Sequence, residues 1–154
     1  MLIELPKLDP DGEQVTGEEP VELLGLGPQD TFKAEGPVCY DFFVQLVDHE
    51  LVVQGRVSVE LSLTCGRCAE IYSTKLTISD FLRAFEIQAG QEAVDLKDDI
   101  REELLLHLPH YPVCEPDCKG LCPQCGHNLN DGLCGCTAPR GDLRWSGLND
   151  LKLK

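Results

Sequence analysis

Leu51-Val-Val-Gln-Gly-Arg-Val-Ser-Val-Glu-Leu-Ser-Leu-Thr64 is the stretch that decides the fold. Apolar and polar residues alternate along it. Successive side chains of a β-strand point to opposite faces, so a period of two predicts a strand with one buried and one wet face. The expected buried positions are Leu51, Val53, Val57, Val59, Leu61 and Leu63, and the expected wet ones are Gln54, Arg56, Ser58, Glu60, Ser62 and Thr64.

Further strands are expected on both sides of this stretch. Val38–Val47 alternates more loosely, and Asp48-His49-Glu50 can turn it into a hairpin with the strand that follows. A third strand, from Ile71 to about Ile78, is rich in β-forming residues. Cys65 and Cys68 would then lie in the short turn between two antiparallel strands.

The N-terminal part, residues 1–36, is acidic and interrupted by prolines and glycines. Short strands are expected around Leu2–Leu5 and Val21–Leu24, joined by a loop such as Asp9–Glu19.

One amphipathic helix is expected after these strands. Asp95 can cap it, Asp98 and Asp99 favour its positive N-terminal end, and Pro109 stops it. Apolar residues recur every four positions and form one stripe, at Leu96, Ile100, Leu104 and Leu108.

These patterns predict an α+β protein with an antiparallel β-rich N-terminal part. The helix is followed by a cysteine-rich loop region stabilised by zinc and by a short terminal helix at about Asp142–Leu151, which carries Trp145. We expect an acidic β-rich domain at 1–92 that includes the Cys65/Cys68 knuckle. Residues 93–154 would hold the helix, the zinc-binding module and the terminal helix, packed on the first domain.

Eight of the nine cysteines fall into four close pairs: Cys65 and Cys68, Cys114 and Cys118, Cys122 and Cys125, and Cys134 and Cys136. Two thiolates a few residues apart can bind one tetrahedral cation, and two such pairs complete the four-sulfur shell of a structural zinc site. The sequence therefore predicts one or two zinc ions. An iron–sulfur cluster also uses four thiolates, but the tight, glycine-rich knuckle at 120–126 favours zinc.

Four pairs can be combined into two sites in three ways. The segment Cys122–Cys136 can close around one ion, so its two pairs are expected to share a site. The other two pairs would then form a second site that links the β-hairpin to the loop after the helix. A single site built from Cys118, Cys122, Cys125 and one of Cys134 or Cys136 is the alternative. His127 is the best-placed substitute ligand, but with eight thiols present we expect no histidine ligand.

Two other interpretations of the cysteines compete with metal. A disulfide framework needs an oxidising compartment, and the first ten residues show no secretory signal, so we expect a cytoplasmic protein with reduced thiols. Cys65-Gly-Arg-Cys68 matches the bare pattern of a redox dithiol. Such a pair needs a helix N-terminus, whereas a strand is expected here. The ninth cysteine, Cys39, is expected to be a small core residue.

The net charge of −14 limits the choice of partner. Each four-thiolate zinc site adds about two negative charges, which brings a protein with two ions to about −18. Phosphates repel such a chain, so a basic protein is the expected partner. The sequence has no apolar stretch near the ~20 residues that span a membrane, and no phosphate-binding loop or hydrolase motif. We therefore expect no membrane partner and no enzymatic activity.

Several of these motifs also resemble one known family. Three stretches are similar to the YceD-like family, which is named for large-subunit ribosomal RNA accumulation. They are Ile100–Pro109, Cys114–Asn130 with Cys134-Gly-Cys136, and Asp142–Leu148. Cys65-Gly-Arg-Cys68 looks like that family's Cys-x-Arg-Cys motif. The chain departs from the family at position 143, where leucine replaces proline.

The resemblance implies a role in the accumulation, processing or assembly of the large ribosomal subunit and its RNA, and it implies no catalytic residues. Together with the charge, it leads us to expect a non-enzymatic zinc-binding factor that binds a basic ribosomal protein or a large-subunit assembly factor. Two alternatives stay open. One is direct binding of ribosomal RNA through the cysteine loops and the basic tail (Arg140, Arg144, Lys152 and Lys154), and the other is a thiol oxidoreductase.

Overall fold

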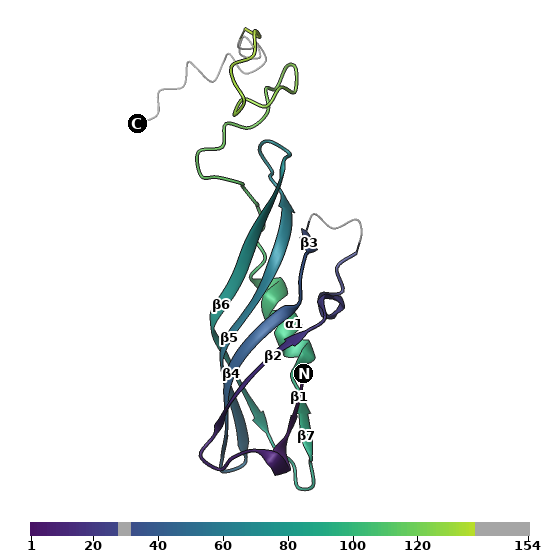
Figure 1. Cartoon of the computed structure of the whole chain (residues 1–154), viewed down its shortest axis with the longest axis vertical. Coiled ribbons are helices and arrows are strands. Elements are labelled where there is room, and N and C mark those ends of the chain that lie inside the picture. The colour runs from purple at the N-terminus through teal and green to yellow at the C-terminus, as the bar shows by residue number, and fades with distance from the viewer. Residues whose placement is uncertain (28–31, 138–154) are drawn as a thin grey trace, which may run out of the picture.

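The computed structural model describes residues 1–27 and 32–137 of the 154 residues. Most of the described chain is antiparallel β-structure, with one α-helix among the described residues (Figure 1). In chain order the elements are β1 (Leu2–Glu4), the 3₁₀ helix η1 (Leu5–Lys7), β2 (Glu13–Glu19), the 3₁₀ helix η2 (Val21–Leu24), β3 (Phe32–Ala34), β4 (Val38–Val47), β5 (Glu50–Thr64), β6 (Ile71–Glu86), β7 (Ala93–Asp95) and α1 (Lys97–Leu106).

Strand β5 is the centre of the main sheet. It pairs with β6 along one edge, and with β4 and then β3 along the other, while β2 pairs with the far side of β4. The two remaining strands, β1 and β7, form a separate antiparallel pair. The predicted antiparallel β-rich part is confirmed.

The predicted alternation in β5 is confirmed by its burial. Its six apolar odd positions are at most 2% exposed, while the even positions are exposed or half-buried. Burying each such side chain stabilises the fold by roughly 1.5–3 kcal/mol. The same core takes in Phe42 from β4 and Phe81 from β6, whose ring centroids lie 4.7 Å apart.

Strand β6 is longer than the sequence predicts, because it continues past Ile78 to Glu86. The register shifts between the pair Gly55–Phe81 and the pair Val57–Ile78, so β6 holds one extra residue there. This β-bulge puts Ile78 and Phe81, three positions apart, on the same buried face. Simple alternation cannot predict that arrangement.

The N-terminal prediction is partly wrong. The expected loop Asp9–Glu19 contains strand β2, which pairs with β4 over its whole length from Glu13 to Glu19. The expected strand Val21–Leu24 is instead the 3₁₀ helix η2. The polar segment Glu13–Glu19 forms a strand because its backbone pairs with β4. The short helix forms because it buries Leu24 and offers that residue's carbonyl to the Arg101 side chain, whose Nε lies 3.2 Å away.

Helix α1 has the predicted apolar stripe, and it packs on the sheet. Leu96, Ile100 and Leu104 are at most 1% exposed. The N-cap is Leu96, one residue later than predicted, but the Asp95 carboxylate still accepts a hydrogen bond from the Lys97 N–H at 3.1 Å. Arg83 on β6 pairs with Asp99 and Glu103 of α1, and these contacts fix the helix across the sheet.

Cys39 does not belong to the core, contrary to the prediction. It is half-buried on the face of β4 opposite the buried Val38 and Phe42, and its Sγ lies 3.8 Å from the Pro37 carbonyl oxygen. It takes no part in the cysteine clusters described below.

The long β5–β6 hairpin carries the cysteine-rich segment at its tip, at the end of the molecule away from β1 and β7 (Figure 1). The division of the chain into 1–92 and 93–154 stays a prediction. The predicted terminal helix at Asp142–Leu151 and the basic tail lie outside the described residues. Within the described ranges, no helix has the length and apolar character needed to cross a membrane.

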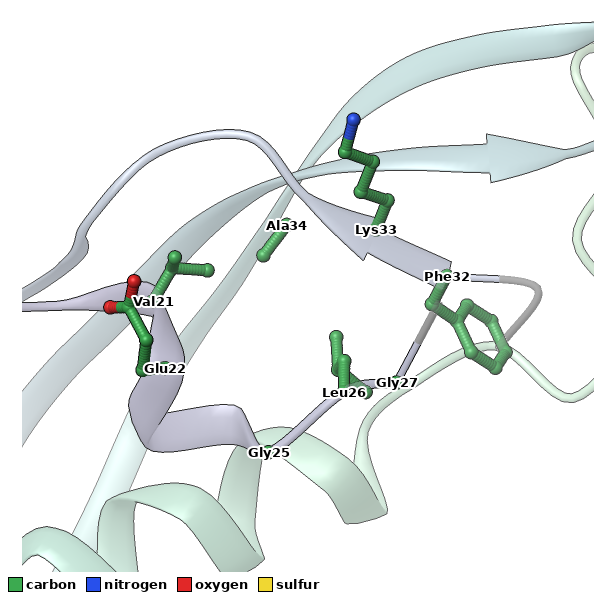
Figure 2. Close-up of a pocket in the computed structure, with 8 residues that line it drawn as sticks. All are labelled: Val21, Glu22, Gly25, Leu26, Gly27, Phe32, Lys33 and Ala34. Carbon is green, nitrogen blue, oxygen red and sulfur yellow. The ribbon is translucent and has the colours of Figure 1, made fainter. Parts of the chain in front are cut away.

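Figure 2 shows a hollow of about 610 Å³ between η2 and β3. Its lining is largely apolar, with Val21, Leu26, Phe32 and Ala34 around it. Among the described residues, Glu22 and Lys33 are its only charged lining residues, and the described lining includes no group of metal-binding or nucleophilic side chains. We assign it no chemistry.

Candidate metal centres

The structure brings the eight paired cysteines together in two groups of four. Within each group all four Sγ atoms lie within 4.8 Å of one another. The first cluster consists of Cys65, Cys68, Cys114 and Cys118, and the second of Cys122, Cys125, Cys134 and Cys136. This is the partition that the spacing favours, and the single mixed site is not formed. All nine cysteines are free thiols, which opposes the disulfide interpretation.

The first cluster joins distant parts of the chain. Cys65 and Cys68 lie in the turn between β5 and β6, as predicted, and the other two cysteines follow α1. The Sγ atoms of Cys65 and Cys118 are 3.9 Å apart, and those of Cys68 and Cys114 are 3.7 Å apart. A tetrahedral zinc ion with Zn–S bonds of 2.3 Å separates its sulfurs by about 3.8 Å. The thiols therefore have the spacing of a zinc shell.

The two knuckles share one backbone pattern. The Cys65 N–H donates to the Glu70 carbonyl at 2.8 Å, and the Cys65 carbonyl accepts from the Ala69 N–H at 2.9 Å. The second knuckle repeats both bonds at the same spacing, from Cys122 N–H to His127 O and from Gly126 N–H to Cys122 O. The fourth residue after the first cysteine has positive φ in each case, 59° at Ala69 and 73° at Gly126. Glycine suits this conformation, so the second knuckle is visible in the sequence and the first is less so.

Arg67 ties the first knuckle to the segment after α1. Its Nη1 donates to the carbonyls of Pro116 and Cys118 at 3.0 and 3.1 Å. Its own carbonyl accepts from the Leu121 N–H at 3.0 Å. Sequence reasoning did not single out this residue, although it is the arginine of the Cys-x-Arg-Cys motif.

Two asparagines between the second knuckle and the last cysteine pair also hold the first cluster. Asn130 donates from Nδ2 to the Sγ of Cys118 at 3.3 Å, and its Oδ1 accepts from the Lys119 N–H at 2.8 Å. Asn128 donates to Glu70 Oε1 at 3.2 Å. Sequence reasoning missed both residues. The available signal was a pair of amide side chains, Asn128 and Asn130, beside a cysteine knuckle.

The second cluster is more exposed than the first. Cys65, Cys68 and Cys118 are at most 7% exposed. In the second cluster Cys125 and Cys136 are exposed. The first cluster packs against Tyr72 and Val113, whereas the cysteines of the second lie in loop segments of the described chain.

Hydrogen bonds stabilise the charged form of one thiol in each knuckle. The backbone N–H of Cys68 lowers the pKa of Cys65 to about 6. The backbone N–H of Cys125 does the same for Cys122, whose pKa is also about 6. A thiolate is the form that binds metal, so each cluster offers at least one ready ligand near neutral pH.

The remaining thiols cannot all ionise without a counter-charge. Burial raises the pKa of Cys114 to about 12. In the second cluster, a hydrogen bond with the Cys125 thiol raises the pKa of Cys136 to about 12. Four negative sulfurs this close repel one another, and a dication in their centre removes that repulsion. The donor set and its spacing fit a zinc ion.

A four-sulfur metal site leaves no coordination position for water, so neither cluster has the features of a catalytic metal site. The turn after Cys68 leads into strand β6 rather than into a helix, which removes the usual means of activating a redox dithiol. Fold and clusters together define an antiparallel β-sheet protein with two four-cysteine groups that can hold metal ions.

Sequence comparison then shows which known family part of the chain resembles. Residues 83–152 match the family described as Large ribosomal RNA subunit accumulation protein YceD. Residues 83–152, a little under half of the chain, are therefore similar to this YceD-like family.

The relatives divide into two groups. An uncharacterised protein of Mycobacterium tuberculosis is 33% identical over 126 residues, which cover 72% of this chain and 60% of the relative. An uncharacterised protein of Mycobacterium leprae is 27% identical over 129 residues. The maize protein named Large ribosomal RNA subunit accumulation protein YCED homolog 1, chloroplastic, is 38% identical over 64 residues, 42% of this chain and 21% of its own length. The chain thus spans about three fifths of the mycobacterial relatives. No solved structure matches it.

Proposed function

We propose that this protein is a non-enzymatic, zinc-binding factor for the accumulation of large-subunit ribosomal RNA in the cytoplasm. The match of residues 83–152 to the YceD family carries this proposal. The plant relatives bear the same function in their names, and the matched segment contains α1 and six of the eight clustered cysteines.

The clusters support a structural role for the metal. Each offers four thiols within 4.8 Å of one another, and together they would hold two zinc ions. The ion in the first cluster would fasten the segment after α1 to the tip of the β5–β6 hairpin. The ion in the second would close the loop from Cys122 to Cys136.

The charge supports a protein partner. With a net charge of −14 before metal binding, the chain repels phosphates and attracts cationic proteins. We propose that it acts by binding a basic ribosomal protein or large-subunit assembly factor. Direct RNA binding is the competing outcome.

Native mass spectrometry tests the metal content. The protein purified from cells should carry the mass of two zinc ions, and a chelator should remove the second cluster's ion first, because Cys125 and Cys136 are exposed. Comparing Cys68→Ser with Cys125→Ser identifies the ion that leaves first. Simultaneous loss of both ions contradicts the predicted order, and a metal-free native protein contradicts zinc binding.

Binding to purified components tests the function. The zinc-loaded protein should be immobilised and incubated with proteins extracted from large ribosomal subunits. A separate incubation should use the protein-free RNA of the same subunits. We expect retention of one or more basic proteins, weakened by salt, and no RNA binding. Retention of RNA alone, with affinity that falls steeply with salt, would support the competing function.

A further inference from the structure

Strand β6 has a long free edge. Its 16 residues pair with β5 on one side, and among residues 1–27 and 32–137 no strand pairs with the other side. In Figure 1 no described helix or strand runs alongside that outer edge; the loop after α1 crosses β6 near the hairpin tip, where Pro109 and Val113 line a hollow with residues 72–76. Free edges of this length are templates for strand addition, and proteins usually cover or blunt them.

The ladder shows which backbone groups are free. The Cys65 N–H bonds to Glu70 O one step beyond the pair Thr64–Ile71. Paired and unpaired residues alternate along an antiparallel ladder, so the even residues from 72 to 78 bond to β5. The N–H and C=O groups of Ile71, Ser73, Lys75 and Thr77 therefore point outward.

This part of the edge is not blunted in the way that the opposite edge is. Strand β2, at the other side of the sheet, is short and carries Glu13, Glu18 and Glu19. Between Ile71 and Ile78, by contrast, Lys75 is the only charged residue. Ile71 is 73% exposed, so a large apolar side chain stands uncovered at the start of the strand.

An acidic pocket lies at that same end of β6. Its volume is about 410 Å³, and Ile71, Tyr72 and three cysteines of the first cluster belong to its lining. One lysine faces four carboxylates there, contributed by Glu70, Glu115, Asp117 and Asp131. In the described part of the chain, only the two cysteine groups bring three or more metal-binding side chains within 4.8 Å of one another. The pocket therefore suits an organic cation rather than a chelated ion.

We propose that the edge Ile71–Ile78 accepts an extended segment of a cationic protein as an added strand, with one of its lysine or arginine side chains in the acidic pocket. The proposal rests on the proposed function, whose basic partner it places on the molecule. Main-chain hydrogen bonds supply affinity in such complexes, and pockets for individual side chains supply specificity. A second copy of this chain is disfavoured, because two molecules of charge −14 repel each other.

Ser73→Pro tests the edge, with Ser73→Ala as its matched control. Both variants lose the Oγ hydrogen bond to Glu35, but only proline removes the outward N–H. Purified large-subunit proteins, assayed singly, are the probes. A protein bound by the wild type should bind Ser73→Pro about tenfold or more weakly, because proline removes a donor and obstructs the edge, and should bind Ser73→Ala within about twofold. Hydrogen exchange at residues 73, 75 and 77 should slow in the complex.

A charge variant tests the pocket without altering the backbone. Glu115→Gln, Asp117→Asn and Asp131→Asn together should weaken binding by about tenfold and reduce its salt dependence. The control combines Asp48→Asn, Glu50→Gln and Glu86→Gln, exposed residues at the other end of the hairpin with the same change of charge. It should weaken binding by no more than about threefold, because distant charges are screened.

The outcomes separate the two proposals. If basic proteins bind Ser73→Pro and Ser73→Ala equally, or bind both charge variants equally, the docking surface is wrong and the proposed function stands. If no basic protein binds the wild type, both are wrong. If the wild type forms a dimer that Ser73→Pro abolishes, the edge binds a second copy of this chain. If the β6 edge amides exchange slowly in the free protein, and truncation after residue 137 makes their exchange fast, the edge binds this chain's own C-terminal segment.

Discussion

Replacing Cys68 with serine should leave one zinc ion bound instead of two and release residues 112–122 from the tip of the β5–β6 hairpin. Cys68 and Cys114 are 46 positions apart, and their Sγ atoms lie 3.7 Å from each other. Structural zinc contributes about 10–16 kcal/mol in zinc-finger peptides, far more than the roughly 1 kcal/mol of one hydrogen bond. Arg67 and Asn130 alone should not hold the segment.

The measurements are native mass spectrometry and hydrogen exchange. We expect fast exchange in residues 112–122, with slow exchange retained in β4 and β5, because the main core cluster contains no cysteine. Cys39→Ser is the matched control, since this thiol lies outside both clusters. If Cys68→Ser keeps two ions and wild-type exchange, the first cluster is not a metal site.

Gly55→Ala should destabilise the sheet by about 3 kcal/mol or more, the upper end of the range for overpacking a core. Gly55 lies at the β-bulge with φ of 153°, and a Cβ there would come within 2.2 Å of the Asp41 carbonyl oxygen. It would also lie 2.9 Å from the Phe42 Cα. Both neighbours are backbone atoms of β4, so relief requires separation of the two central strands.

Urea unfolding measures this effect as a change in the free energy of unfolding. Gly36→Ala is the control, because no atom lies within 4 Å of a Cβ there and no positive φ is required. That variant should be neutral or slightly stabilising, by less than about 1 kcal/mol, because alanine restricts the unfolded chain. If the two variants have equal stability, the close approach of β4 and β5 at Gly55 is not a constraint.

Local patterns predicted the elements whose own side chains determine them. The apolar stripe of α1 and the alternation in β5 follow from periodicity, because burial selects one face of each element. The Cys65 and Cys68 turn followed from the two strands around it. The second knuckle was the clearest, because Gly126 supplies the positive φ that its backbone needs.

Errors arose where a neighbouring element decides the conformation. Glu13–Glu19 has too little alternation to predict a strand, yet the backbone of β4 pairs with it throughout. The bulge in β6 reverses which positions face the core beyond Ile78, so periodicity could not extend that strand to Glu86. Asn130 was missed because an amide reveals its partner only when the fold brings Cys118 within 3.3 Å.

The amino-acid sequence by itself determined that this protein has a one-sided β-sheet, one amphipathic helix and four pairs of thiols, since each depends on residues near one another in the chain. Tertiary structure alone decided that the pair at the hairpin tip meets the pair after α1, because closing a loop of some fifty residues depends on the path of the whole sheet and helix between them. It likewise decided that no strand of residues 1–27 and 32–137 pairs with the outer edge of β6, which lies beside an acidic pocket, because whether an edge is covered depends on where the other strands pair.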